Sequence, residues 1–319
     1  MLLSGLNNCV ILPHQARIRA SMPHRISRSW SFPTAALLIS TLLINGCASL
    51  APTPSSTLQP QPLRLSFDAP SSEFPGLQIG RLEQWSAPLA PGARIEVINP
   101  WGDVYIRHNR GGDRVGLSAT VQRLGIPAPE ERISIESSAD HVRMRVNYPD
   151  GATPAEGFER IGRVDIAVLV PAGSPLEVHT ADGSITGKRV RSNIIARSGS
   201  GKIDLSTTGW VDAASESGSI QLVMIGGSWL HPTRAFSESG DIAVEIPIAA
   251  DMRIEAQAGR EVLLAPEDLR QVIAIEGGQA TGTWGKAGTD NELVAESRQG
   301  QVTISLYGWI RSAATAQEH

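Results

Sequence analysis

Three acidic side chains form the most suggestive chemical pattern in this sequence. Glu216 and Glu238 each stand two residues before a glycine, and Asp241 directly follows the second of these glycines. If the two segments form neighbouring strands, the two glutamates would lie close together. Such a pair could coordinate Ca²⁺ or, at about 5 Å, act as a retaining glycosidase pair. A solvated column of turn charges that discourages edge pairing is the favoured interpretation, because no long loops rise beside these segments to build sugar subsites.

Tryptophans form the second pattern. Trp210 and Trp309 each stand nine residues after a glycine of the repeat described below, and Trp229 and Trp284 lie between them. Exposed indole rings in a row could stack on the sugar rings of a polysaccharide or of peptidoglycan. We favour rings that pack over corners of the fold or cap its end, where a large side chain covers exposed core. The segment 307–310 most resembles such a cap.

Other catalytic signatures are missing from the sequence. It contains no Gly-Xxx-Ser-Xxx-Gly elbow and no phosphate-binding loop of the Walker type. Four histidines lie outside the leader and the last residue, and they lack metal-ligand spacing: His108, His141, His179 and His231. We therefore predict a protein that is not an enzyme and that uses neither a metal nor a cofactor.

The charge balance argues against nucleic acid as a partner. Four of the 28 Lys and Arg residues and none of the 32 Asp and Glu residues precede Cys47, so the chain from Cys47 onward has a formal charge of 24 − 32 = −8. Binding to nucleic acid depends on basic patches. Cys9 and Cys47 are the only cysteines, so the domain that follows Cys47 contains no thiol for a disulfide.

A short repeat positions the acidic residues and the tryptophans. It is anchored by Gly183, Gly201, Gly218 and Gly240, at spacings of 18, 17 and 22 residues, and an isoleucine follows each glycine by two places. Apolar or small residues stand seven and five places before each glycine, and a serine or threonine stands three places before. This alternation predicts strands with one inward face, joined at glycine turns and stacked as a solenoid. Glycine would allow positive φ at each corner, and the hydroxyls would satisfy the turn amides.

The repeat extends in both directions with less regularity. N-terminal to the repeat, Gly102 fits the same frame, and longer strands with alternating apolar residues are expected between residues 115 and 170. After it, Gly300 restores the frame, whereas the apolar residues after Gly259 come one place late, which predicts a bulge or a register slip. Residues 265–290 are irregular, with one helical turn expected at 266–269, so the number of C-terminal rungs stays open.

The N-terminus has the features of a targeting segment. Arg25 and Arg28 precede an apolar run at 35–44 that is too short to span a bilayer but suits a signal peptide. The run ends at Ile44-Asn45-Gly46-Cys47, which resembles the lipobox of bacterial lipoproteins, in which the cysteine receives the lipid. Met22 is a candidate for the true start. By resemblance to lipoprotein sorting rules, Ala48 favours the outer membrane.

The repeat resembles the bacterial "putative adhesin" family, also known as toast-rack domains, over roughly residues 93–308. The segments that carry the resemblance are Asn99-Pro-Trp-Gly-Asp-Val104, Val168-Leu-Val-Pro-Ala172, Thr180-Ala-Asp-Gly-Ser-Ile185, Ser198-Gly-Ser-Gly-Lys-Ile203, Ser215-Glu-Ser-Gly-Ser-Ile220 and Ser237-Glu-Ser-Gly-Asp-Ile242. The resemblance implies an adhesion-like β-solenoid. It implies no catalytic or binding residues.

These observations predict an all-β chain, a single-stranded-repeat β-solenoid with longer antiparallel strands in its N-terminal part. We expect a lipoprotein signal peptide (1–46), a lipidated Cys47 with a Pro- and Ser-rich linker and lead-in (47–92), the solenoid (93–310) and a frayed tail (311–319). The predicted function is a lipid-anchored adhesion or protein-interaction scaffold of the bacterial cell envelope, at the outer membrane and facing the periplasm.

 The envelope scaffold would act through its flat sheet faces, by surface complementarity with a partner and without a reaction.

Two alternatives stay open at this point. A carbohydrate- or peptidoglycan-binding protein, or less readily a hydrolase, would use the tryptophans together with Glu216 and Glu238. A sensor of envelope stress that acts through a partner protein fits the anchor equally well and leaves no separate mark in the sequence. An aromatic-lined groove with convergent carboxylates would favour the carbohydrate hypothesis, and a prism without such a groove would favour the scaffold.

Overall fold

The computed structural model describes residues 57–61, 63, 65–67, 77–82, 84–124, 132–148 and 163–308. Residues Met1–Thr53 and Pro54–His319 form separate units, and every described residue belongs to the second. The expected signal peptide, Cys47, Met22, Trp309 and the tail at 311–319 therefore lie outside the described residues. No helix among the described residues is long and apolar enough to cross a membrane.

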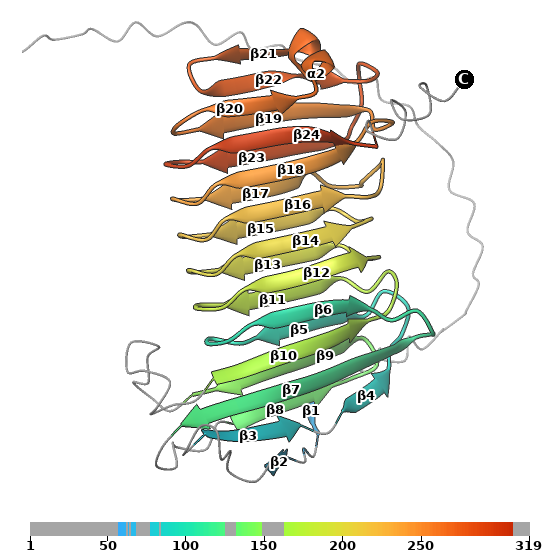
Figure 1. Cartoon of the computed structure of the whole chain (residues 1–319). Helices are drawn as coiled ribbons and strands as arrows, with labels where there is room; N and C mark the ends of the chain where they lie inside the picture. Colours follow the sequence, from blue (N-terminus) through green and yellow to red (C-terminus); the bar gives the residue numbers. More distant parts are fainter. Residues whose placement is uncertain are drawn as a thin grey trace, which may run out of the picture. The chain divides into compact units, whose positions relative to one another are not determined.

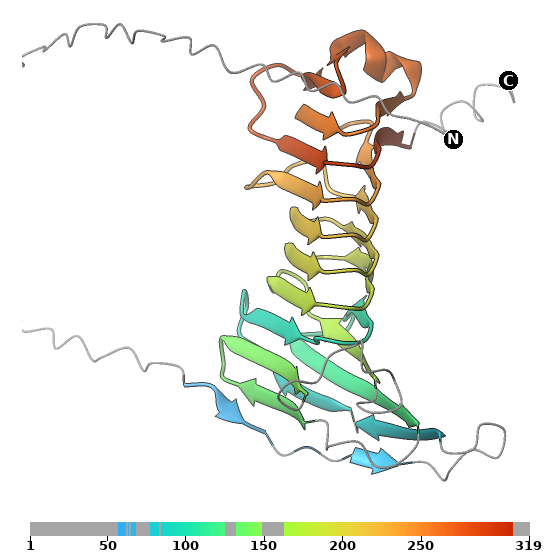
Figure 2. The same cartoon turned by 90° about the vertical axis from the view of Figure 1, so that its left-hand side faces the viewer.

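The described part of the chain is an all-β solenoid made of two facing sheets of 12 strands each (Figure 1). Each repeat supplies one strand to each sheet, and the glycine turn joins the two. In the repeat around Gly201, for example, β13 (Ile194–Ser198) lies in the first sheet and β14 (Ile203–Thr207) lies in the second. Figure 2 shows the two layers from the side of the glycine turns. The predicted fold class is confirmed.

The strands of the two sheets alternate along the repeats. The first sheet has the order β1 (Gln59–Pro60), β8 (Arg132–Ser137), β9 (His141–Asn147), β5 (Arg94–Ile98), β11 (Leu176–Thr180), β13, β15 (Val211–Ser215), β17 (Thr233–Ser237), β23 (Glu292–Ser297), β19 (Met252–Ala258), β22 (Gln279–Trp284) and β21 (Ile273–Glu276). The second has the order β2 (Leu65–Phe67), β3 (Leu77–Leu82), β7 (Arg114–Leu124), β10 (Arg163–Val170), β6 (Val104–His108), β12 (Ile185–Val190), β14, β16 (Ile220–Met224), β18 (Ile242–Pro247), β24 (Val302–Tyr307) and β20 (Val262–Ala265), with β4 (Trp85–Pro88) beside β7.

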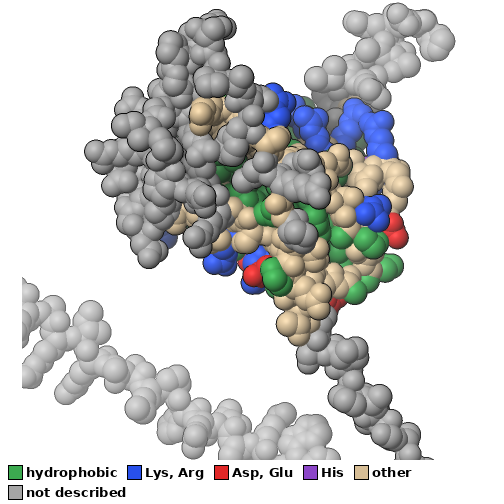
Figure 3. All heavy atoms as spheres, turned by 90° about the horizontal axis from the view of Figure 1, so that it is seen from below, with side chains coloured by type: hydrophobic (Ala, Val, Ile, Leu, Met, Phe, Trp, Pro, Cys, Tyr) green, Lys and Arg blue, Asp and Glu red, His purple; other side chains and the backbone are tan. Residues whose placement is uncertain are grey.

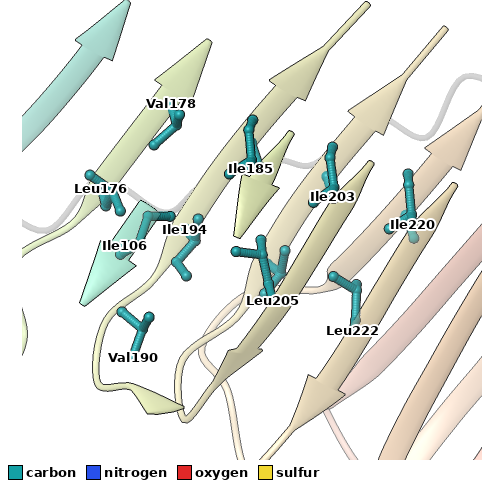
Figure 4. Close-up of a cluster of buried hydrophobic side chains, with 14 of the residues drawn as sticks. Ile106, Leu176, Val178, Ile185, Val190, Ile194, Ile203, Leu205, Ile220 and Leu222 are labelled. Atoms are coloured by element: carbon teal, nitrogen blue, oxygen red, sulfur yellow. The ribbon is translucent and has the colours of Figure 1, made fainter. Parts of the chain in front are cut away.

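The core consists of stacked columns of apolar side chains, one from each inward position of the repeat. Ile185, Ile203 and Ile220 are register partners on consecutive strands, and all three are buried (Figure 4). Each such side chain contributes about 1.5–3 kcal/mol through burial. The inward columns predicted seven, five and three places before the glycines are buried as well, so the predicted period-two alternation is confirmed.

The hydroxyls three places before the glycines bond the turns to one another. Ser237 Oγ accepts the Gly240 N–H at 2.8 Å and donates to the carbonyl of Gly218, one rung away, at 3.1 Å. Ser198 makes the same pair of bonds with Gly201 and Gly183. Each buried hydroxyl therefore satisfies one turn amide and one carbonyl of the neighbouring turn, as the sequence predicts.

The reason for glycine at the turns differs from the prediction. Of the anchor glycines, only Gly102 has a positive φ, at 129°. At Gly201, a Cβ would instead lie 1.8 Å from the carbonyl oxygen of Gly183. Glycine is needed there because the turns stack in direct backbone contact, and the expectation of positive φ at each corner is wrong.

The N-terminal part joins antiparallel strands to the parallel stack. β7 pairs antiparallel with β10, which pairs parallel with β6, so β10 links the two arrangements. The expected antiparallel strands are confirmed. The lead-in at 47–92 supplies β3 and β4, which both pair with β7.

The last repeat does not occupy the end of the stack. β24 pairs on one side with β18 and on the other with β20, so the final rung, made of β23 and β24, lies between rungs that precede it in the chain. The irregularity after Gly259 is a shorter turn: three residues lie between Ala258 and Val262, whereas four lie between their register partners Ser297 and Val302.

The stretch 265–290 closes the end of the stack without forming a complete rung. It contains the helix α2 (Glu267–Val272), which agrees with the helical turn expected there, and the antiparallel pair β21 and β22. Leu269 of the helix is fully buried. This segment therefore covers the core that the last rung would otherwise expose.

Candidate functional site

The acidic residues singled out in the sequence do stack, but they do not form a free carboxylate pair. Glu238 N–H donates to the carbonyl of Ser215, so its turn lies against that of Glu216. The carboxylate of Glu238, however, pairs with Arg298 at 2.9 Å. Arg298 lies in the turn of the rung made of β23 and β24, which is inserted between earlier rungs and is called the inserted rung below. The order of the sequence therefore did not reveal this pair. The glycosidase arrangement needs two available carboxylates, and here one of the two is held by a guanidinium.

Asp241 is likewise held by its neighbours. Its Oδ1 accepts the Gln301 N–H at 2.8 Å and a hydrogen bond from Arg260. The bond from the Gln301 backbone and the charge of Arg260 lower the pKa of Asp241. Gln301 lies in the turn of the neighbouring rung and Arg260 in the turn of the rung beyond it, so this carboxylate links three successive turns.

The tryptophans do not form an exposed row. Trp229 is 6% exposed, and its Nε1–H donates to the carbonyl of Thr208 at 3.2 Å. Trp210 is half-buried against the core and meets His231 edge to face, with 5.5 Å between the ring centroids. Trp284 also packs against the core. All three rings thus pack against the core, and the burial of Trp229 leaves no exposed ring face for a sugar to stack on.

The structure brings together no group of three or more potential metal ligands among the residues it describes. The histidines lie on different strands and turns. His141 faces Glu96 at 3.3 Å, and His179 faces Glu177 at 2.6 Å. The repeat therefore supplies each of these two histidines with a carboxylate neighbour on the outer sheet surface.

Among the described residues, a shallow groove on the outer face of the first sheet is a candidate site. It has a volume of about 410 Å³ and crosses β11, β13, β15 and β17 beside the glycine turns. The four outward residues at its centre are consecutive register partners: His179, Arg197, Ala214 and Phe236. Ala214 leaves the space because it is the smallest of the four, between a long side chain and a ring. We call this site the Ala214 groove.

One wall of the Ala214 groove is aromatic. The ring of Phe236 is covered by the guanidinium of Arg298, which lies 5.2 Å from the ring centroid. Arg298 is held in turn by Glu238, and by Glu296 at 3.6 Å. A cation over an aromatic face is attracted by the ring quadrupole. The inserted rung therefore supports this wall from behind.

The opposite wall is polar, and its arginine is already paired. Arg197 forms an ion pair with Asp212 at 3.0 Å and donates to the Asp212 carbonyl at 2.6 Å. Its guanidinium is thereby held down along the sheet. This arrangement keeps the space above Ala214 open, because the long side chain does not turn into it.

His179 also belongs to this wall, where its pKa is lowered. Burial lowers the pKa of His179, and the charge of Arg197 lowers it further. Glu177, whose Oε1 lies 2.6 Å from His179 Nε2, would favour the charged ring, but Arg94 also pairs with Glu177.

Glu216 stands at the rim of the groove. It is exposed, and no described residue pairs with its carboxylate. The groove thus offers an apolar floor at Ala214, an aromatic wall at Phe236 and one available acceptor at Glu216. This combination suits a ligand with an apolar stem and a cationic or amide end.

Sequence reasoning found Glu216 but missed the rest of this groove. The signal available in the sequence was the fourth position before each anchor glycine, which holds His179, Arg197, Ala214 and Phe236 in turn. The alternation of strand residues marks this column as outward. Stacked rungs place the side chains of an outward column side by side. A small residue between large ones in such a column therefore predicts a groove in the surface.

A second polar cluster lies on the outer face of the second sheet, and its charged side chains are paired with one another. Arg163 pairs with Asp103 at 2.6 Å and with Asp165 at 2.8 Å. Asp103 also accepts the Ser184 N–H at 2.8 Å. These bonds join β10, β6 and the turn before β12. The cluster therefore joins the antiparallel part to the first rungs.

Comparisons with known proteins give low similarity throughout. No family model matches the chain, and no curated protein matches it. A solved structure from Clostridium sporogenes, described as a "putative cell adhesion protein", is 12% identical, with a TM-score of 0.44, over 70% of this chain and 99% of that one. A "putative adhesin" from Bacteroides fragilis is 10% identical, with a TM-score of 0.29, over 75% of this chain and 99% of that one. A "Putative lipid binding protein" from Parabacteroides distasonis is 12% identical, with a TM-score of 0.20, over 70% and 96%. At these scores we draw no functional argument from the likeness.

Proposed function

We propose that this chain is a non-enzymatic interaction module of the bacterial cell envelope that holds a partner protein in the Ala214 groove. The observation that carries the proposal is the groove itself, which crosses four strands of a regular sheet beside the exposed carboxylate of Glu216. Its floor belongs to the sheet that covers the core, so the site is rigid. A rigid site costs little conformational entropy when a partner binds.

The groove's chemistry favours an extended segment with a basic side chain. The stem of a Lys or Arg would pack on Ala214 and against the ring of Phe236, and its charge would reach Glu216. Main-chain N–H groups of the same segment could donate to Glu216 when no cation is present. Of the groove's charged side chains, Arg197 is already paired with Asp212, so Glu216 determines the preference for a cation.

The position in the cell is part of the same proposal. A lipid at Cys47 would hold the domain at the membrane, and the resemblance of Ala48 to sorting signals supports the outer membrane, facing the periplasm. Replacing Cys47 with alanine should abolish incorporation of labelled fatty acid and release the chain from the membrane fraction. Unchanged fatty-acid labelling would contradict the anchor without affecting the groove.

The groove is tested by filling it. The variant Ala214→Trp should lose capture of a discrete envelope protein by the chain from Ala48 onward, measured by pull-down from solubilised envelope. Val223→Trp is the matched control, because Val223 is an outward, half-buried residue of β16 in the opposite sheet. Equal capture by both variants would contradict the proposal. Retention on isolated peptidoglycan sacculi that Ala214→Trp removes would instead favour a carbohydrate ligand.

A further inference from the structure

A group of cations lies on the opposite edge of the solenoid from the glycine turns. We define the cationic edge as Arg107, Arg110, Lys188, Arg189 and Arg191, all of which are exposed. These residues lie at or just beyond the carboxyl ends of β6 and β12, the neighbouring strands whose arrowheads point to the right in Figure 1. The cationic edge is therefore separate from the Ala214 groove, which lies on the other sheet.

A β-bulge in β12 brings two of these cations together. The repeat from Gly183 to Gly201 is one residue longer than the next repeat. The extra residue lies within β12, where the register shifts between Gly187 and Val190. Arg189 in the bulge has a φ of 54°, and its N–H donates to Ser206 Oγ at 2.7 Å. Arg189 is the one non-glycine residue with positive φ in the part of the chain that the structure describes. Such outliers occur preferentially at functional sites.

The cations are placed against one another and lack counter-charges. Lys188 lies directly opposite Arg107 on the neighbouring strand, and like charges in that position are unfavourable. No carboxylate of a described residue lies within 4.0 Å of any cation of the cationic edge. This holds also for Asp113, in the turn after β6. Other arginines of this domain, such as Arg163 and Arg197, do have such partners.

This lack of partners is notable because the domain is acidic as a whole. The chain from Cys47 onward has a formal charge of −8, so carboxylates outnumber cations by eight. The charges are also unevenly spread at the β2 end of the stack, where Lys and Arg side chains gather along one edge of the visible face (Figure 3). This local excess of positive charge on an acidic domain favours an anionic partner from outside the chain.

We propose that the cationic edge binds the phosphate groups of an anionic lipid surface. The guanidinium fork matches phosphate oxygens, and the five cations lie along an exposed edge, which suits a surface. β1 begins 12 residues after Cys47, a stretch that spans at most about 40 Å. An anchor at Cys47 would thus hold the start of β1 within about 40 Å of the headgroups, and a lipid chain combined with a basic patch gives firmer attachment than one signal.

The test uses the chain from Ala48, which contains the whole compact unit that begins at Pro54, and needs no lipid on the protein. Flotation measures its binding to vesicles of phosphatidylcholine with phosphatidylglycerol and to vesicles of phosphatidylcholine alone. We expect binding only to the first kind, weakening as salt rises. The triple variant Lys188→Gln, Arg189→Gln, Arg191→Gln should lower the partition coefficient at least about tenfold.

A matched variant keeps the test specific. Arg145→Gln, Arg234→Gln, Lys286→Gln removes the same charge from exposed residues elsewhere and should leave binding close to that of the unaltered chain. Circular dichroism would establish that both variants fold. Equal binding to both kinds of vesicle, no binding to either, or equal loss in the two triple variants would overturn the proposal. If millimolar pyrophosphate at constant ionic strength abolished vesicle binding, the proposal of a lipid surface would be overturned, and a soluble phosphate compound would be the favoured ligand. None of these results depends on the Ala214 groove.

Discussion

The carbonyl oxygen of Gly183 lies 1.8 Å from the position that a Cβ of Gly201 would occupy. The same relation links Gly218 to Gly201, at 2.0 Å, and Gly240 to Gly218, at 2.2 Å. Because atoms cannot approach so closely, each turn excludes any side chain at its anchor position. The stacking of backbones at this edge therefore determines the one residue type that every rung shares.

The first prediction concerns this contact. Gly201→Ala should lower the free energy of unfolding by about 3 kcal/mol, because the new methyl group must displace the neighbouring backbone. Gly227→Ala is the control, since nothing lies within 4 Å of its Cβ position and its φ is not positive. Chemical denaturation of both variants measures the difference. Equal stability of the two would show that the turns can separate without cost.

The hydroxyl column gives a second prediction. Ser237→Ala removes the acceptor of the Gly240 N–H and the donor to the Gly218 carbonyl. Leaving these turn groups without partners should cost about 2 kcal/mol of unfolding free energy. Ser219→Ala, in the turn after Gly218, should change stability by only a few tenths of a kcal/mol. If the two variants unfold at the same denaturant concentration, the hydroxyl column contributes nothing to stability.

The third prediction concerns pH. Because the pKa of Asp241 is lowered in the folded chain, its contribution to stability is present above its ordinary value of 3.8 and is lost as the pH falls through the folded value. Asp241→Asn should therefore lower stability at neutral pH, by less than about 1 kcal/mol for so exposed a group. The difference should vanish in strong acid. Asp290→Asn, at an exposed loop position, is the control. A deficit that stays constant with pH would show that the effect is not ionic.

The fourth prediction concerns the bulge. Arg189→Val should lower the free energy of unfolding by more than about 1 kcal/mol, because a β-branched residue resists positive φ. Arg189→Gly should unfold at or above the denaturant midpoint of the unaltered chain, since glycine adopts this conformation without strain. Both variants remove the charge of Arg189, so a change of charge cannot explain a difference in stability between them. A greater loss with glycine than with valine would contradict the assigned backbone conformation.

The inward columns could be predicted from the sequence because they follow from local alternation. Ile203 and Ile220 are identifiable as buried by their distance from a glycine, and they are indeed register partners. The need for glycine itself could be predicted, but its cause could not. The close approach of Gly201 to Gly183 depends on the distance between rungs, which no single repeat encodes.

The order of the last rungs could not be predicted. Gly300 fits the repeat frame, and in the structure Gly300 lies against Gly240, with the rung of β19 and β20 beyond it. Every rung presents the same inward columns, so each could stack on any other. The insertion creates the contacts of Arg298 with Glu238 and Phe236, and for this reason the wall of the Ala214 groove was also hidden from the sequence.

Photocrosslinking in intact cells is the most direct test of the Ala214 groove. A photoreactive phenylalanine analogue placed at residue 214, and separately at residue 223 in the opposite sheet, would report which sheet face touches a partner. We predict one discrete crosslinked protein from position 214 that is absent from position 223, and that weakens when Glu216 is replaced with glutamine. The same crosslinked products from both positions, or none from position 214, would contradict the assignment of the groove as the binding site.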